Sequence, residues 1–91
     1  MRILLAEDEP TLREFVARGL EEAGYAVDAF EDGGDALLAS QVVDYDIAIL
    51  DIQMPGKSGL DVCLGVRARG GSGPAILFLT ARDAIADRVE G

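Results

Sequence analysis

The chain has 91 residues, a mass of 9.6 kDa and a formal net charge of −9, from 17 acidic and 8 basic side chains. A chain of this size forms one small domain, and its charge repels phosphate backbones and anionic lipid, so we expect it to bind neither nucleic acid nor a membrane. One cysteine and no histidine exclude an internal disulfide, a Cys/His zinc site and histidine-based catalysis. The apolar runs are too short to cross a bilayer and the acidic N-terminal segment does not resemble a signal peptide, so we expect a cytoplasmic protein.

Short apolar segments alternate with helical patterns along the chain. Continuous apolar character in three of these segments predicts strands that are buried on both faces of a parallel sheet, and an alternating segment predicts an edge strand. The alternation predicts an α/β fold with right-handed crossovers and helices on both faces. In chain order we expect strand 3–6, a helix from Pro10 to Gly24, strand 25–30, helix 34–41, strand 47–50, helix 59–69, strand 75–79 and a helix that begins near Asp83.

Capping signals and apolar spacing define the predicted helices. In the first helix, Pro10 suits the first helical position, and Thr11 with Glu14 resembles a capping box. We expect Glu9 to be a loop or helix-cap residue, and Ser58 to cap the third helix. The predicted core-facing residues are Leu12, Phe15, Val16, Gly19, Leu20 and Ala23 in the first helix, Ala36 and Leu37 in the second, and Leu60, Cys63 and Leu64 in the third.

Acidic side chains follow two of the predicted strands. Glu7 and Asp8 come after the first strand, and Asp51 comes after the third. Ligands of open parallel sheets bind beyond the carboxyl ends of the strands, so these carboxylates converge if the two strands are neighbours. Close carboxylates raise one another's pKa unless a cation lies between them, and an all-oxygen ligand set suits Mg²⁺. Such a site can receive a phosphoryl group, with a carboxylate as the nucleophile.

Two other phosphate chemistries fit the sequence poorly. Gly56-Lys57-Ser58 resembles the end of a P-loop, but that pattern requires glycine at the position of Asp51. A phosphatase with an aspartate nucleophile needs a second acid two residues later, where this chain has Gln53. We therefore set both aside and expect Lys57 to be a solvated loop charge.

Several ordered blocks of the sequence form one pattern: residues 3–10, 24–27 with 31–33, 45–59, and 74–83. Together these blocks resemble the receiver domain of two-component response regulators, in the style of those that carry a DNA-binding output domain. The resemblance covers essentially the whole chain. It implies a flavodoxin-like, doubly wound parallel sheet of strand order 2-1-3-4, in one receiver domain over residues 1–91.

The resemblance also implies roles for individual residues at the acidic site. Asp51 would accept a phosphoryl group from a sensor histidine kinase. Mg²⁺ would be bound by Asp8, Asp51 and the backbone carbonyl of Gln53, with Glu7 acting through water. The protein would then be a phospho-accepting switch that controls an output such as transcription, and not an enzyme in the usual sense.

The end of the sequence departs from the family pattern. Thr80 would contact the phosphoryl group as the switch residue, and the small Ala81 would leave room above the site. The family's fifth strand, its catalytic lysine and its fifth helix would follow, and we expect the domain to be truncated before them, with no catalytic lysine. Segment 75–79 would then be an apolar sheet edge, which predicts a homo-oligomer or a domain-exchanged dimer. A receiver fragment that cannot signal and acts only in interaction or self-association is the alternative function.

Overall fold

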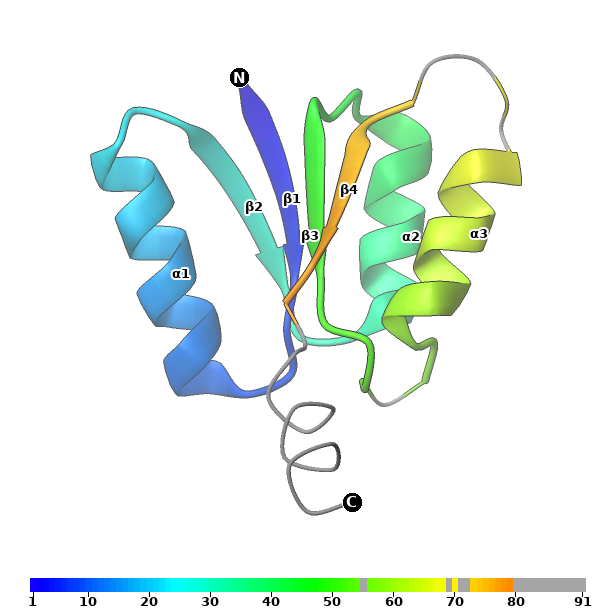
Figure 1. Cartoon of the computed structure of the whole chain (residues 1–91), viewed down its shortest axis with the longest axis horizontal. Helices are drawn as coiled ribbons and strands as arrows, with labels where there is room; N and C mark the ends of the chain where they lie inside the picture. Colours follow the sequence, from blue (N-terminus) through cyan, green and yellow to red (C-terminus); the bar gives the residue numbers. More distant parts are fainter. Residues whose placement is uncertain (55, 69, 71–72, 80–91) are drawn as a thin grey trace, which may run out of the picture.

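A computed structural model of the chain describes residues 1–54, 56–68, 70 and 73–79. Its strands form a parallel sheet in the order β2-β1-β3-β4 (Figure 1). The predicted α/β fold and strand order 2-1-3-4 are therefore confirmed, while the helix predicted near Asp83 lies outside the described residues. The elements are β1 (Arg2–Ala6), α1 (Pro10–Glu22), β2 (Ala26–Phe30), α2 (Gly33–Val42), β3 (Ile47–Leu50), α3 (Gly59–Ala68) and β4 (Ala75–Phe78).

The sheet lies between two helical layers. Helix α1 covers one face, and α2 and α3 cover the other (Figure 1). Because successive strand residues point to opposite faces, β1 contributes Ile3 and Leu5 to the core under α1, and Leu4 and Ala6 to the core under α2 and α3. All four side chains are buried, which is why this segment is continuously apolar. Among the described helices, none is long and apolar enough to cross a membrane.

The start of α1 corrects one prediction. The capping residue is Glu9, whose carboxylate accepts hydrogen bonds from the backbone N–H groups of Thr11, at 3.1 Å, and Leu12, at 2.7 Å. The predicted capping box of Thr11 and Glu14 is wrong, and Glu14 instead pairs with Arg18 on the surface. The reason is that a proline in the first helical position leaves the residue before it as the cap. Helix α3 begins as predicted, because the Ser58 hydroxyl accepts a hydrogen bond from the Asp61 N–H at 3.2 Å.

The buried faces of two helices also differ from prediction. In α3 the buried side chains are Val62 and Val66, while Leu60 and Leu64 are 52% and 69% exposed. Cys63 packs against the core as predicted. In α1, Val16 and Leu20 pack on the sheet as predicted, together with Ala17, whereas Phe15 is 75% exposed and Gly19 and Ala23 are also exposed. Apolar spacing alone could not choose the buried face, because both helices carry apolar residues on more than one side.

Candidate functional site

The acidic residues predicted to converge do so at the carboxyl edge of the sheet. Strands β1 and β3 are neighbours in register, with Ala6 opposite Leu50, so the residues that follow them lie at the same level. The backbone N–H of Asp51 donates to the carbonyl of Ala6 at 2.9 Å and continues this ladder. One carboxylate oxygen from each of Glu7, Asp8 and Asp51 lies within 4.8 Å of the others. These three residues are called the acid cup below.

The members of the acid cup differ in their exposure to solvent. Asp8 is exposed, Asp51 is half-buried, and Glu7 is 1% exposed. The pKa of Glu7 is raised to about 7, chiefly because the carboxyl is buried. The neighbouring Asp8 and Asp51 carboxyls also raise it, while the hydrogen bond that Glu7 accepts from the Glu9 backbone N–H at 2.9 Å lowers it. Mutual repulsion was the expected cause of such a shift, but loss of hydration is the larger one.

The chemistry of the acid cup fits a hard divalent cation. Its donors are all oxygens, and a cation among them would favour the ionised form of Glu7, which burial otherwise disfavours. The Gln53 N–H donates to Asp51 Oδ1 at 3.3 Å, which places Gln53 beside the cup. The ligand role of its carbonyl oxygen stays a prediction. Thr80 and Ala81, the predicted switch residues, lie outside the described residues.

Two backbone anchors hold the acid cup in place. The Arg13 guanidinium donates to the backbone carbonyl of Glu7 at 3.0 Å, which ties the loop after β1 to α1. On the β3 side, Gly59 lies so close that a Cβ there would overlap the carbonyl oxygen of Asp51, and its N–H donates to Ile52 at 2.9 Å. Sequence reasoning missed both anchors. A glycine directly after the cap Ser58, where a better helix former is normally favoured, was the available signal.

A groove of about 450 Å³ lies beside the acid cup. Asp8 of the cup lines it, together with Glu31 and Asp32 from the turn between β2 and α2 and Lys57 from the β3–α3 connection. Asp32 also caps α2, since its carboxylate accepts the Asp35 N–H at 2.8 Å. Lys57 is exposed, in agreement with its prediction as a solvated loop charge.

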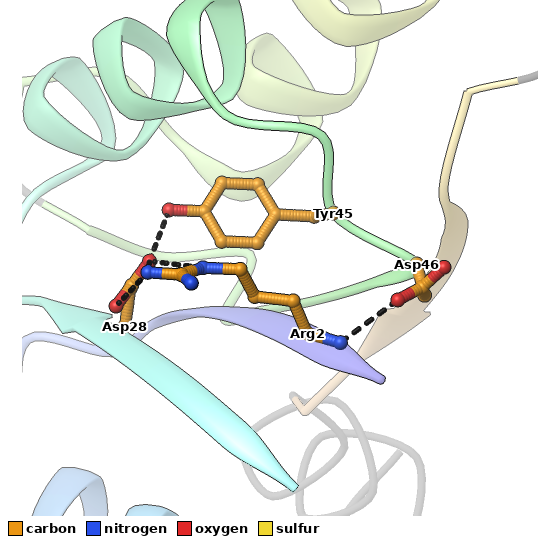
Figure 2. Close-up of polar contacts among 4 residues, drawn as sticks. All are labelled: Arg2, Asp28, Tyr45 and Asp46. Carbon is orange, nitrogen blue, oxygen red and sulfur yellow. Dashed lines mark hydrogen bonds and ion pairs between the residues drawn. The ribbon is translucent and has the colours of Figure 1, made fainter.

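A second polar cluster lies at the amino edge of the sheet, and sequence reasoning missed it (Figure 2). Asp28 Oδ2 accepts hydrogen bonds from the Tyr45 hydroxyl at 2.7 Å and from Arg2 Nε at 3.1 Å, and Asp46 accepts the Arg2 backbone N–H at 2.8 Å. Tyr45 is 7% exposed, and burial together with the Asp28 carboxylate raises its pKa to about 12. The phenol therefore stays a proton donor. No local sequence pattern predicts this cluster, because its members come from distant parts of the chain.

Comparisons with known proteins agree with this geometry. A family model described as the response regulator receiver domain matches residues 3–91. The transcriptional activator protein IrlR of Burkholderia pseudomallei is 46% identical over 91 residues, which are 100% of this chain and 39% of that protein. The chain therefore spans well under half the length of this relative.

Solved structures are similar over almost the whole chain. The response regulator TrrA of Thermotoga maritima, crystallised with Mg²⁺ and BeF, is 31% identical with a TM-score of 0.74, and the match covers 98% of this chain and 96% of that one. TrrA in complex with the histidine kinase ThkA gives 31% identity and a TM-score of 0.74, over 98% of this chain and 95% of that one.

Proposed function

This chain belongs to the response regulator receiver domain family, and from that premise we propose that Asp51 accepts a phosphoryl group from a sensor histidine kinase. The observation that carries the proposal is the acid cup, in which Glu7 and Asp8 lie beside an aspartate at the carboxyl edge of a parallel sheet. The complex of TrrA with a histidine kinase supports the choice of partner. We expect the exchange to take place in the cytoplasm.

In the proposed reaction a carboxylate oxygen of Asp51 attacks the phosphorus of a phosphohistidine. The new O–P bond forms as the P–N bond breaks, and the imidazole nitrogen leaves with that electron pair and takes up a proton. The Gln53 N–H orients Asp51 through its bond to Oδ1. The product is an acyl phosphate on the chain itself, so the protein acts as a switch and not as a turnover enzyme.

We propose that Asp8, Asp51 and the Gln53 carbonyl hold Mg²⁺, with Glu7 acting through water. The ion would neutralise charge on the transferring phosphoryl oxygens. Glu7 supports the proposal because a nearly fully buried carboxylate among like charges is unfavourable without a cation. The switch itself is assigned to Thr80 and Ala81. As IrlR is named a transcriptional activator, we propose transcription as the output of the whole protein.

Labelling with acetyl phosphate in the presence of Mg²⁺ tests the proposal. Wild-type protein should gain one phosphoryl group, visible as a mass increase or a gel shift, and Asp51→Asn should gain none because the nucleophile is lost. Asp44→Asn is the matched control, since Asp44 is an exposed aspartate between α2 and β3, at the opposite edge of the sheet. Label retained on Asp51→Asn would place the site elsewhere.

The alternative function is that of a self-association module that does not signal. Among the described strands β4 is an outer strand of the sheet, and its side chains Leu77 and Phe78 are 55% and 41% exposed. An apolar sheet edge invites pairing with another chain, which favours a homo-oligomer or a domain-exchanged dimer. Sedimentation should show species above 9.6 kDa at high protein concentration, and Leu77→Lys should shift them toward the monomer. A single 9.6 kDa species at every concentration would contradict this alternative.

A further inference from the structure

Gly33, the first residue of α2, lies against the backbone of a different loop. A Cβ at this position would overlap the carbonyl oxygen of Lys57 and would lie 2.7 Å from its carbonyl carbon and 3.0 Å from its Cβ. The obstacle is backbone, so no change of rotamer relieves it. Gly33 does not have a positive φ, so the position requires glycine for space and not for its backbone conformation.

Both segments that meet at this contact are connected to the acid cup. Lys57 belongs to the connection that starts at Asp51, and Gly59 packs the far end of that connection against the Asp51 carbonyl. On the other side, Gly33 follows the turn after β2, whose last residue Phe30 accepts the Glu7 N–H at 3.0 Å. The groove that Asp8 and Lys57 both line lies between these two segments. A shift of the Lys57 backbone therefore changes the spacing between the two halves of the cup.

We infer that Gly33 is a positioning residue for the acid cup. Its missing side chain lets the Asp51 connection lie directly on the start of α2, and this contact sets the separation between Asp51 and the Glu7–Asp8 pair. The inference rests on the proposed function, since it is Mg²⁺ and the phosphoryl donor that this separation accommodates. Gly33 touches neither of them and acts only through the backbone of the loop.

Three glycine-to-alanine variants test the inference. Gly33→Ala should weaken Mg²⁺ binding by about tenfold or more, as changes to groups that orient metal ligands do, and should slow labelling by acetyl phosphate. Gly65→Ala is the control for steric damage remote from the cup, because its Cβ would lie 2.6 Å from a Leu37 methyl between α2 and α3. Gly19→Ala is the control without a clash, since nothing lies within 4 Å of its Cβ. Both controls should keep the Mg²⁺ affinity within about twofold of wild type.

Calorimetric titration of the folded proteins with Mg²⁺ gives the affinities, and thermal unfolding in EDTA gives the stabilities. A Gly33 role limited to stability would lower the melting temperature of Gly33→Ala and leave its Mg²⁺ affinity equal to that of Gly65→Ala, which would overturn the inference. Wild-type protein that binds no Mg²⁺ would contradict the proposed function itself, and this inference with it.

A measurement on wild-type protein tests the inference even if Gly33→Ala does not fold. In a Mg²⁺ titration followed by amide NMR, the Gly33 signal should shift with the same dissociation constant as the Asp51 signal. The Gly65 signal serves as the reference for a glycine remote from the cup. A Gly33 signal that shifts no more than that of Gly65 would overturn the inference.

Discussion

The carboxylates at the two edges of the sheet have opposite electrostatic surroundings. At the amino edge, Asp28 is bonded to both Arg2 and Tyr45, and its ion pair with Arg2 measures 3.0 Å (Figure 2). At the carboxyl edge, Glu7 and Asp51 lie among like charges, and the ion pairs found among the described residues are elsewhere. The same residue types therefore serve two purposes within one small fold.

The difference lies in whether a charge finds its partner within the chain. Compensated charges at the amino edge join β1 and β2 to the two residues before β3, so they contribute to the stability of the sheet. Like charges at the carboxyl edge oppose folding unless they bind a cation or a proton. Such uncompensated charge is typical of a binding site. Substitutions at the two edges should accordingly change stability in opposite directions.

The largest expected effect is the pH dependence that Glu7 imposes on metal-free protein. Its pKa is raised from 4.5 to about 7 in the folded state, so between these values the folded protein holds a proton that the unfolded chain releases. The free energy of unfolding should fall as pH rises through this window, by about 3 kcal/mol in total. Glu7→Gln removes this contribution, so the stability of the variant relative to wild type should rise by that amount between pH 4.5 and about 8.

Urea unfolding in EDTA at a series of pH values measures this difference. Because other carboxyls titrate in both proteins, only the difference between Glu7→Gln and wild type is diagnostic. A difference that does not change with pH would show that folding does not raise the pKa of Glu7, and the contrast between the two edges would be lost.

The opposite sign is expected at the amino edge. Asp28→Ala leaves Arg2 and the buried Tyr45 hydroxyl without their acceptor, so it should lower the free energy of unfolding by about 2 kcal/mol, and Tyr45→Phe by about 1 kcal/mol. Chemical denaturation in EDTA measures both. Asp8→Ala is the matched carboxyl-edge variant and should raise the free energy of unfolding by less than about 0.5 kcal/mol, because Asp8 lies among like charges but is exposed. Equal losses for Asp28→Ala and Asp8→Ala would contradict the comparison.

A smaller effect is expected when Mg²⁺ is added. At ten times its dissociation constant, a ligand that binds only the folded state stabilises it by about 1.4 kcal/mol, which raises Tm by roughly 6–11 °C for a chain of this size. Wild-type protein and Tyr45→Phe should show the same rise, whereas Asp8→Ala should show little. NaCl at matched ionic strength controls for screening. A Tm that does not respond to millimolar Mg²⁺ would contradict the proposal that the acid cup binds this ion.

Much of the fold was predictable because burial requires a recognisable pattern of apolar residues in the local sequence. Strands buried on both faces must be apolar throughout, so segments 3–6 and 47–50 identified β1 and β3 within a residue of their observed bounds. The acid cup followed from these strands, since Glu7, Asp8 and Asp51 are the residues that come directly after them. Helix faces were less predictable, as Phe15 shows, because an apolar residue at helical spacing need not meet the sheet.

The sequence by itself determined the order of the elements, the ends of the strands and the acidic character of the carboxyl edge, since each depends on residues close together in the chain. Only the tertiary structure decided which groups meet across long separations. Asp28 lies 26 residues from Arg2 and 17 from Tyr45, and Gly33 meets the backbone of Lys57. Such contacts depend on how strands and loops pack in three dimensions, and no local pattern records the space that a missing side chain leaves.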